Sequence, residues 1–409
     1  MHKFRLSGRK TTIRYKQHMK KNLIVILTSV FVTVGQFAMA LYLPALPALT
    51  TYFHTFPGVI QLSLTLFLIA FGFSQLFYGS LSDCYGRKPL LLIGLVIVMI
   101  GFLIAVFARH LSLLLIARVV QGLGAGSVSV LARAVIRDRF EGEKLVQALS
   151  LLIMAASLAP MIAPFIGGHI QHRLGWHSIF IFLFFYSGLI LLGIFFLLPE
   201  TKKTESVPFK MGALLNNYKL LLRHPIYIKY VVCIIMAYAC QILYLSISPF
   251  IFQNGLKLNA AQYSTIITLP AIGYFVGNFL STRLIRFFDS NHLVFVGALI
   301  VVMAGIALAL EAAFNGLSAF SVITPIIFCV IGIGLIYPNV ISGSLSPFPQ
   351  MAGTAAALSG AIQMAGTSSI AGVTNVLHVV SVLGLGISFL LCGAVVLLMI
   401  FRIMRTSVQ

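Results

Sequence analysis

The chain has 409 residues, of which 59% are hydrophobic and only 9% are charged. Soluble domains carry about 25% charged residues, and a chain this apolar would expose large hydrophobic patches in water. These values exclude an ordinary soluble protein and indicate an integral membrane protein. The length accommodates about twelve helical spans of about twenty residues with short loops. The apolar runs are too long and unbroken for the alternating strands, of about ten residues each, of a membrane barrel.

Apolar runs separated by short polar stretches define the predicted domain organisation. Residues 1–21 form a basic cytoplasmic tail, residues 22–199 an N-terminal half of six spans, and residues 200–227 a basic cytoplasmic linker. Residues 228–402 form a C-terminal half of six spans, and residues 403–409 a second cytoplasmic tail. The predicted spans are 22–43, 57–80, 89–108, 112–134, 145–166, 177–198, 228–249, 263–284, 292–312, 319–340, 352–376 and 382–402.

The start of the chain has two further interpretations. Met19 is an alternative translation start, and the basic residues followed by an apolar run also resemble a secretory signal. The many spans that follow favour the first span as a retained membrane helix.

The net charge of +20 would also fit a nucleic-acid-binding protein, but the basic residues follow the predicted topology. With the N-terminus in the cytoplasm, almost all Lys and Arg residues fall on the inner side. The outer side keeps only Arg109, Arg173 and Lys257. This asymmetry obeys the positive-inside rule. We therefore predict a multi-pass protein of the cell inner membrane with both termini in the cytoplasm, a lipid bilayer as its surroundings and no nucleic-acid partner.

A short charged motif, GSLSDCYGRK from Gly79 to Lys88, lies between the second and third spans. A turn of mixed charge between two membrane-length helices is a hairpin whose tip stays in water. Glycine allows close backbone approach at Gly79 and a positive φ at Gly86. Asp83 and Arg87 are able to form charge-assisted hydrogen bonds. The motif resembles the signature loop of the major facilitator superfamily.

This resemblance implies an all-α membrane protein of the major facilitator fold, with two pseudo-symmetric six-helix halves around a central cavity. It also implies a cytoplasmic gate in which Arg87 pairs with Asp138, while Asp83 meets the start of the eleventh span. The alternative is a set of solvated loop charges that contribute little to stability. The predicted gating residues are Gly79, Asp83, Gly86, Arg87, Lys88, Asp138, Pro160 and Pro164.

The fourth span contains Arg118, the one basic residue that the predicted topology places well inside the bilayer. A charge at that depth costs several kcal/mol unless it is paired or faces water. Arg118, Gln121 and Gly122 lie at positions i, i+3 and i+4 and share one helix face. The pattern resembles the Arg-bearing motif in helix four of the superfamily, which implies that Arg118 lines the cavity and acts in proton coupling. The alternative is an arginine that extends toward the membrane surface.

The fifth span carries Pro160 and Pro164, which kink the helix, and small residues that allow close packing. It resembles the Gly/Pro motif of helix five in drug antiporters, which implies a packing and gating role. Together with YLPALP at 42–47, SQLFYG at 74–79 and the segment 347–355, it resembles the Bcr/CflA branch of drug:proton antiporters.

Polar and aromatic residues inside apolar spans are candidates for contacts with substrate, since a mostly apolar cavity with few polar anchors suits amphipathic compounds. Each of them is alternatively a helix-packing residue. The predicted cavity residues are Gln36, Tyr42, Gln61, Tyr78, Gln121, Gln241, Tyr244 and Gln363. Further candidates of the same kind are Gln75, Tyr238, Tyr274 and Tyr337.

The predicted function is proton-coupled efflux, by alternating access, of drugs or other amphipathic small molecules by a monomer. Alternatives are a dedicated exporter of an endogenous metabolite such as a siderophore or amino-acid derivative, a non-transporting sensor or scaffold, and an importer. No catalytic constellation, nucleotide-binding loop or metal-ligand spacing is present, so we predict no enzyme activity, cofactor or metal. The first span has no carboxylate, so the proton carrier stays open. The candidates are Asp83, Asp138, Glu311, His169 and His177.

Overall fold

The computed structural model describes residues 22–202, 211–313, 318–376 and 381–407. The predicted tail at 1–21 and the end of the second tail lie outside the described residues. The first span is the helical segment Asn22–Tyr52. The bounds of the labelled helices are η1 (Leu43–Ala45), α2 (Leu46–Tyr52), α3 (Pro57–Tyr85), α4 (Arg87–Val106), α5 (Leu111–Arg139), α6 (Gly142–Leu174), α7 (Trp176–Leu197), α8 (Met211–Arg223), α9 (Pro225–Pro249), η2 (Phe250–Gly255), α10 (Ala260–Ile266), α11 (Thr268–Leu284), α12 (Ser290–Ala313), α13 (Ala319–Leu345), η3 (Pro349–Met351), α14 (Ala352–Val376) and α15 (Val382–Ser407).

Eleven helical segments in the described part of the chain are long and apolar enough to cross a membrane. The remaining predicted span, 352–376, is the 25-residue helix α14. This helix carries many Gly, Ala, Ser and Thr residues and packs along both α3 and α9. Small residues suit such close helix contacts, so α14 has less apolar character than its neighbours. With α14 the structure has the predicted two halves of six membrane helices.

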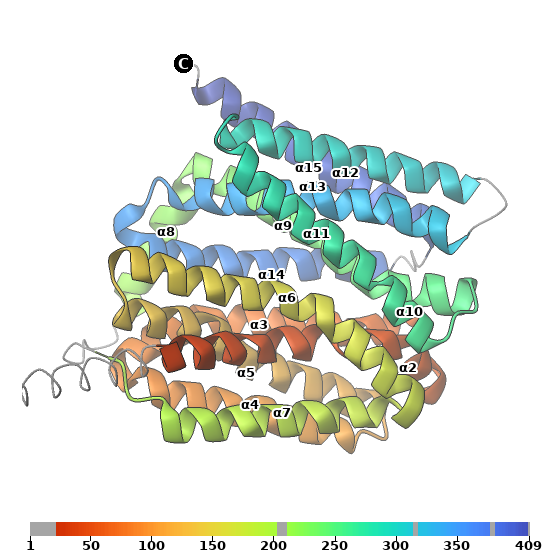
Figure 1. Cartoon of the computed structure of the whole chain (residues 1–409), viewed down its shortest axis with the longest axis horizontal. Helices are drawn as coiled ribbons and strands as arrows, with labels where there is room; N and C mark the ends of the chain where they lie inside the picture. The colour runs from red at the N-terminus through yellow and green to blue at the C-terminus, as the bar shows by residue number, and fades with distance from the viewer. Residues whose placement is uncertain (1–21, 203–210, 314–317, 377–380, 408–409) are drawn as a thin grey trace, which may run out of the picture.

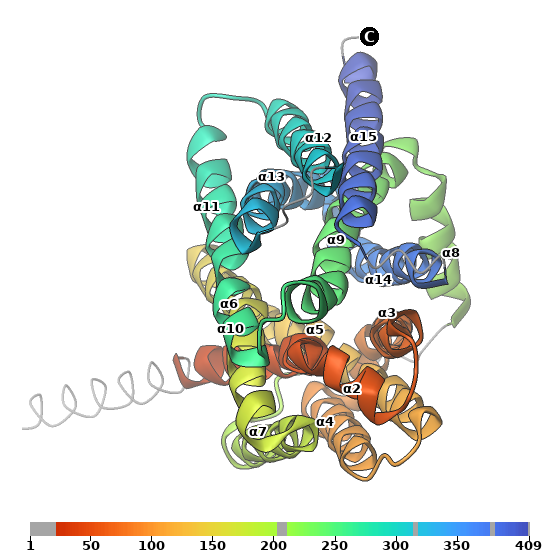
Figure 2. The ribbon, with the colours of Figure 1, turned by 90° about the vertical axis from the view of Figure 1, so that its right-hand side faces the viewer.

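The helices run along one common direction, and the two halves form two layers (Figure 1). The linker helix α8 lies at one end of the bundle, while α2 and α10 lie at the opposite end. We call these the α8 end and the α10 end. Figure 2 looks at the α10 end and shows α3 beside α14 on one side of the contact between the halves, with α6 beside α10 on the other.

Within the N-terminal half, glycines of α5 allow the helices to approach closely. A Cβ at Gly122 would overlap the Phe67 carbonyl of α3, and a Cβ at Gly126 would overlap the Ser74 hydroxyl. On the neighbouring face, a Cβ at Gly124 would lie 2.5 Å from the Gly94 carbonyl of α4. Close backbone contact of this kind is the usual basis of helix association in membranes. It fixes α5, and with it Arg118, between α3 and α4.

Two segments differ from the expectation. The predicted linker is not only a loop, because it contains the helix α8. The predicted span 263–284 begins earlier and is divided into α10 and α11 at Ile267. Pro270 lacks the N–H that would continue the hydrogen-bond ladder back to Ile266, which explains the break. A π-helical turn, η2, also follows Pro249 at the same end of the bundle.

Candidate functional site

The signature motif forms a cluster of ion pairs at the α8 end. Arg87 Nη2 lies 2.7 Å from Asp83 Oδ1, and Arg87 Nε lies 2.9 Å from Asp138 Oδ2. Arg87 Nη1 also donates a hydrogen bond to the Ser82 hydroxyl. The predicted pairing of Arg87 with Asp138 is therefore present. Asp83 shares a cavity wall with Gly353 at the start of α14, but its ion pair is with Arg87, inside its own half.

The Glu200 carboxylate binds the backbone at the C-terminal end of this motif, a role that the sequence analysis missed. Its Oε1 accepts a hydrogen bond from the Arg87 amide at 3.0 Å, and its Oε2 accepts one from the Lys88 amide at 3.1 Å. A carboxylate there is favourable, because the first amides of a helix lack partners and carry partial positive charge. Gly86 has a φ of 97°, and a Cβ there would lie 2.7 Å from Glu200 Oε2.

Two lysines strengthen the connection between the linker and the motif. Lys88 Nζ donates to the Phe195 carbonyl at the end of α7 at 2.7 Å, and Lys202 Nζ donates to the Cys84 carbonyl at 2.8 Å. The segment after α7 is thus fastened to the loop between α3 and α4. An isolated acid between a membrane span and a basic linker was the available sequence signal for Glu200.

We expect Glu200→Gln to destabilise the protein in a pH-dependent way. Burial alone raises the pKa of Glu200, but hydrogen bonds from the amides of Lys202, Arg87, Lys88 and Thr201 outweigh it and lower the pKa below its usual value. A lowered folded-state pKa stabilises the protein above the unfolded value of about 4.3, and that stabilisation is lost as the pH falls through the folded-state pKa.

The measurement is the thermal melting temperature in detergent at several pH values. An anion at a helix N-terminus contributes about 0.3–1 kcal/mol to the free energy of unfolding. The Glu200→Gln protein should therefore melt about 2 °C below the wild type at pH 7. The difference should shrink below about pH 4. Glu311→Gln is the matched control, because Glu311 lies near the C-terminal end of α12, where no helix N-terminus is available to its charge. A difference of constant size at all pH values would show that the charge of Glu200 is not what stabilises the motif.

Arg118 is fully buried and is held inside the N-terminal half. Its Nη1 donates to the Ala38 carbonyl at 2.8 Å and to Gln121 Oε1 at 2.6 Å, and its Nε donates to the Ser63 carbonyl at 3.3 Å. The guanidinium carbon also lies 4.1 Å from the centre of the Tyr42 ring, as in a cation–π contact. The prediction that Arg118 lines the cavity is wrong for this conformation, and so is the alternative that it extends to the surface.

Three predicted cavity residues have structural partners instead. Tyr42 is fully buried, contacts Arg118 and shares a hydrogen bond of 3.1 Å with the Ser63 hydroxyl. Gln121 accepts from Arg118 and donates to the Gly101 carbonyl at 3.0 Å. Gln61 donates to the Ser246 carbonyl of the other half at 2.8 Å. These hydrogen bonds satisfy Tyr42 and Gln121, as buried polar groups require, whereas Gln61 Oε1 has no partner among the described residues.

A cavity with a volume of about 440 Å³ lies between the two halves at the α8 end. Its wall comes from α3, the start of α4, α5, α6, α8, η3 and α14. It holds Asp83 and Arg87 together with two further arginines of α5, Arg133 and Arg137. Gln75, an additional candidate from the sequence, also lines it.

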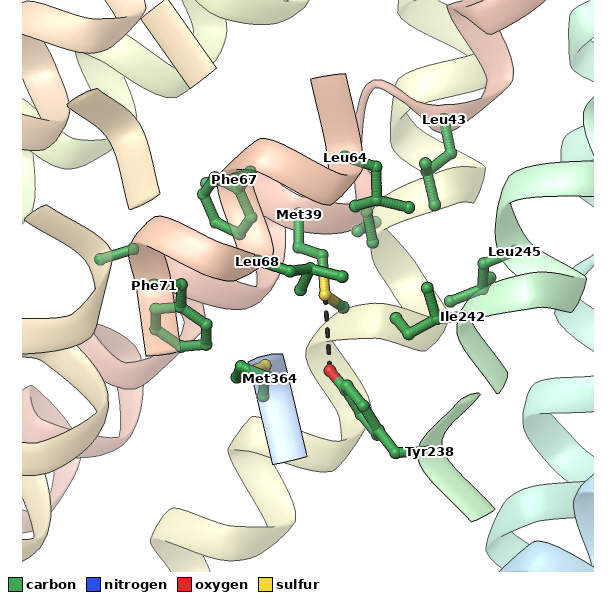
Figure 3. Packing of buried hydrophobic residues seen from close by; sticks show 14 of the residues in the cluster. Met39, Leu43, Leu64, Phe67, Leu68, Phe71, Tyr238, Ile242, Leu245 and Met364 are labelled. Atoms are coloured by element: carbon green, nitrogen blue, oxygen red, sulfur yellow. Dashed lines mark hydrogen bonds between the residues drawn. The ribbon is translucent and has the colours of Figure 1, made fainter. Parts of the chain in front are cut away.

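The α10 end is closed by contacts between the halves. Gln253 Nε2 donates to the Pro44 carbonyl at 2.9 Å, beside the contact between Gln61 and Ser246. A Cβ at Gly168 of α6 would overlap the Ser264 side chain of α10. Further in, Met39, Leu64 and Leu68 of the first half face Tyr238 and Ile242 of the second (Figure 3). The Tyr238 hydroxyl lies 3.5 Å from Met39 Sδ.

A second cavity, of about 30 Å³, is lined by two of the predicted gating residues and two of the predicted cavity residues. Pro160 and Pro164 of α6 face Gln241 and Tyr244 of α9 across it. The Tyr244 hydroxyl is buried and has no hydrogen-bond partner in the described part of the chain. These residues therefore meet at the contact between the two halves.

The other predicted residues have different surroundings. Gln363 of α14 accepts a hydrogen bond of 3.1 Å from the Tyr337 hydroxyl of α13. Tyr78 is buried and Gln36 is half-buried, and neither lies on the wall of the two cavities described above. The expected close approach at Gly79 is wrong, because a Cβ there would meet Val130 at an ordinary 3.6 Å.

Comparison with known proteins defines the class. The family model of the Major Facilitator Superfamily matches residues 28–373. The chain therefore belongs to this family of membrane transporters and is not an enzyme. This confirms the predicted fold of twelve helices in two halves.

The chain is similar to Multidrug resistance protein D (EmrD) of Escherichia coli K12, with 29% identity covering 94% of this chain and 96% of that protein. It is also similar to the Bicyclomycin resistance protein homolog of Haemophilus influenzae, with 26% identity covering 85% and 87%. Both relatives agree with the predicted Bcr/CflA branch. The structure resembles that of a D-xylose-proton symporter with a TM-score of 0.76 and 14% identity, covering 93% and 96% of the two chains.

Proposed function

We propose that this protein is a proton-coupled exporter of drugs or related amphipathic small molecules and works by alternating access. The observation that carries the proposal is a cavity of about 440 Å³ between the halves at the α8 end, while the α10 end is closed. A site between two repeats that opens to one side at a time is the general design of such transporters. The names of the relatives, multidrug resistance and bicyclomycin resistance, support this substrate class.

The α8 end is proposed to face the cytoplasm. It carries a concentration of basic residues on the loops and helix ends around α8, in agreement with the positive-inside rule. The structure then represents a state with its cavity toward the cytoplasm. Both halves of the fold belong to one chain, which supports a monomer as the working unit.

The gating roles follow from this orientation. Asp83, Arg87 and Asp138 form a network that closes or opens the cytoplasmic side, and Gly86 and Lys88 hold its turn against Glu200. Gly79 contributes by lining the cavity. Pro160 and Pro164 act at the opposite gate, where α6 meets the second half.

Proton coupling has to work without a carboxylate at mid-membrane depth in the described part of the chain. Each described acid lies in a loop or near the end of a helix. We propose that Arg118 takes part in coupling through the network of Tyr42, Ser63 and Gln121. Its Nη2 is buried and has no hydrogen-bond partner in the described residues, so the network has a free donor.

The test is substrate-dependent proton movement in everted membrane vesicles that contain the full chain. We expect addition of an amphipathic dye or drug to dissipate an imposed pH gradient, with vesicles that lack the protein as the control. The panel contains cationic, neutral and anionic compounds. If no compound changes the gradient although the protein is folded in the membrane, the proposed antiport is wrong.

A further inference from the structure

We propose that the cavity at the α8 end receives the negatively charged group of an amphipathic organic anion through Arg133 and Arg137. The inference rests on the proposed transport function and specifies its substrate class. It predicts a preference for anionic over cationic amphipaths.

The charges on the cavity wall do not balance. Asp83 is the one carboxylate among the described residues of the wall, and Arg87 occupies it in an ion pair of 2.7 Å. Arg87 is in turn paired with Asp138. A cationic substrate therefore finds no free acid there, whereas Arg133 and Arg137 add positive charge that nothing on the wall neutralises.

Neither of these two arginines has an ion-pair partner in the part of the chain that the structure describes. Both side chains are exposed, and both line the cavity. Arg133 donates from Nε to the Ser129 carbonyl at 3.2 Å and from Nη2 to the Ser129 hydroxyl at 3.1 Å. These bonds orient the guanidinium and leave its Nη1 side for a ligand.

The two guanidinium groups come from one face of α5, because residues four apart lie one above the other on a helix. Arg137 also reaches the second half, since a Cβ at Gly353 of α14 would lie 2.8 Å from its Nη1. Carboxylates, sulfonates and phosphates accept several hydrogen bonds at once, and planar guanidinium groups match this geometry. An anion held there would contact both halves of the transporter.

Apolar side chains on the wall of the same cavity suit the rest of such a substrate. Leu76 of α3, Leu149 of α6, Leu214 of α8 and Met351 of η3 line the cavity together with the two arginines. They come from both halves and from the linker, so the apolar part of a ligand would also contact both halves. A flexible methionine accommodates varied apolar groups.

The test compares matched compounds in everted vesicles containing the full-length protein. The anion is 1-anilinonaphthalene-8-sulfonate, the neutral compound is its parent N-phenyl-1-naphthylamine, and the cation is rhodamine 6G. Uptake into the vesicles is measured directly together with the pH gradient. We expect the wild type to transport the sulfonate at least ten times more efficiently, as kcat/KM, than the cation.

The variant Arg133→Gln/Arg137→Gln should lose at least tenfold in kcat/KM for the sulfonate and change little for the neutral compound. The variant Arg133→Lys/Arg137→Lys should recover part of the loss, because charge is restored without the planar geometry. Arg283→Gln, on an exposed residue at the same end, is the matched control. The single Gln variants replace the double variant if its melting temperature shows that it does not fold.

The outcomes separate the two proposals. Equal transport of the sulfonate by the wild type and the folded Gln variants would overturn the role of the arginines. Transport of the cation and the neutral compound without the sulfonate would overturn the anion preference and leave the antiport standing. Failure of every compound to move would overturn both.

Discussion

Replacing Arg118 with alanine is expected to abolish substrate-dependent proton movement and to destabilise the N-terminal half. The side chain is fully buried and bonds to two carbonyls that belong to different helical segments, at Ala38 and Ser63. Its removal leaves these carbonyls without that donor and opens a cavity under Tyr42. Large-to-small changes at buried positions cost about 2–5 kcal/mol of the free energy of unfolding.

The measurements for Arg118→Ala are the melting temperature in detergent and the dissipation of a pH gradient in everted vesicles. Arg118→Lys keeps the charge but cannot reach several acceptors with a planar group, so it should recover stability only in part. Arg283→Ala removes an exposed arginine and should leave both readouts unchanged. Wild-type stability and transport in Arg118→Ala would show that this buried network has no part in folding or coupling.

Replacing Gly168 with alanine is expected to open the α10 end and to reduce transport by about tenfold. The added Cβ would overlap the Ser264 side chain and lie 2.6 Å from the Ala260 carbonyl, so α10 has to move away from α6. Such overpacking costs about 1–3 kcal/mol, and it acts only on the state in which these helices touch. A shift of about 1.4 kcal/mol changes the ratio of the two states tenfold.

The displacement can be detected with a cysteine in place of Gln253, whose side chain bonds across the closed end to Pro44. A membrane-impermeant maleimide added to intact cells should label this cysteine faster in the Gly168→Ala protein than in the wild type. Gly188→Ala is the matched control, because a Cβ there meets only the Met99 methyl group at 3.4 Å. Equal labelling rates in all three proteins would contradict the proposed gate at this end.

Much of the fold could be predicted because a lipid bilayer permits few backbone structures. Backbone groups in a bilayer have to be satisfied internally, so each long apolar run becomes a helix. The break at Ile267 was missed because hydropathy does not report a missing backbone hydrogen bond. The helix α8 was missed because it lies outside the apolar runs. α8 lies in a polar linker and owes its position to packing of Leu221 and Tyr218 against the bundle, which hydropathy does not report.

The candidate site was only partly predictable. The pairing of Arg87 with Asp138 could be anticipated because the motif resembles that of a known family. The surroundings of Arg118 could not, because its acceptors at Ala38 and Ser63 are backbone carbonyls, which any residue type provides. Glu200 was missed because its partners are backbone amides more than a hundred residues away, at Arg87 and Lys88.

The contrast between the glycine contacts and the buried cluster around Tyr238 bears on which positions of such a protein change in evolution. At Gly122 and Gly168 any side chain would collide with backbone atoms. A substitution there would disturb the helix packing that transport needs and would be selected against. Met39, Met364 and Tyr238 belong to one buried cluster and pack through flexible or flat side chains, which tolerate replacement (Figure 3). Substitutions should therefore accumulate around these three residues rather than at the glycines, because a change of side chain there leaves the backbone contacts between the helices intact.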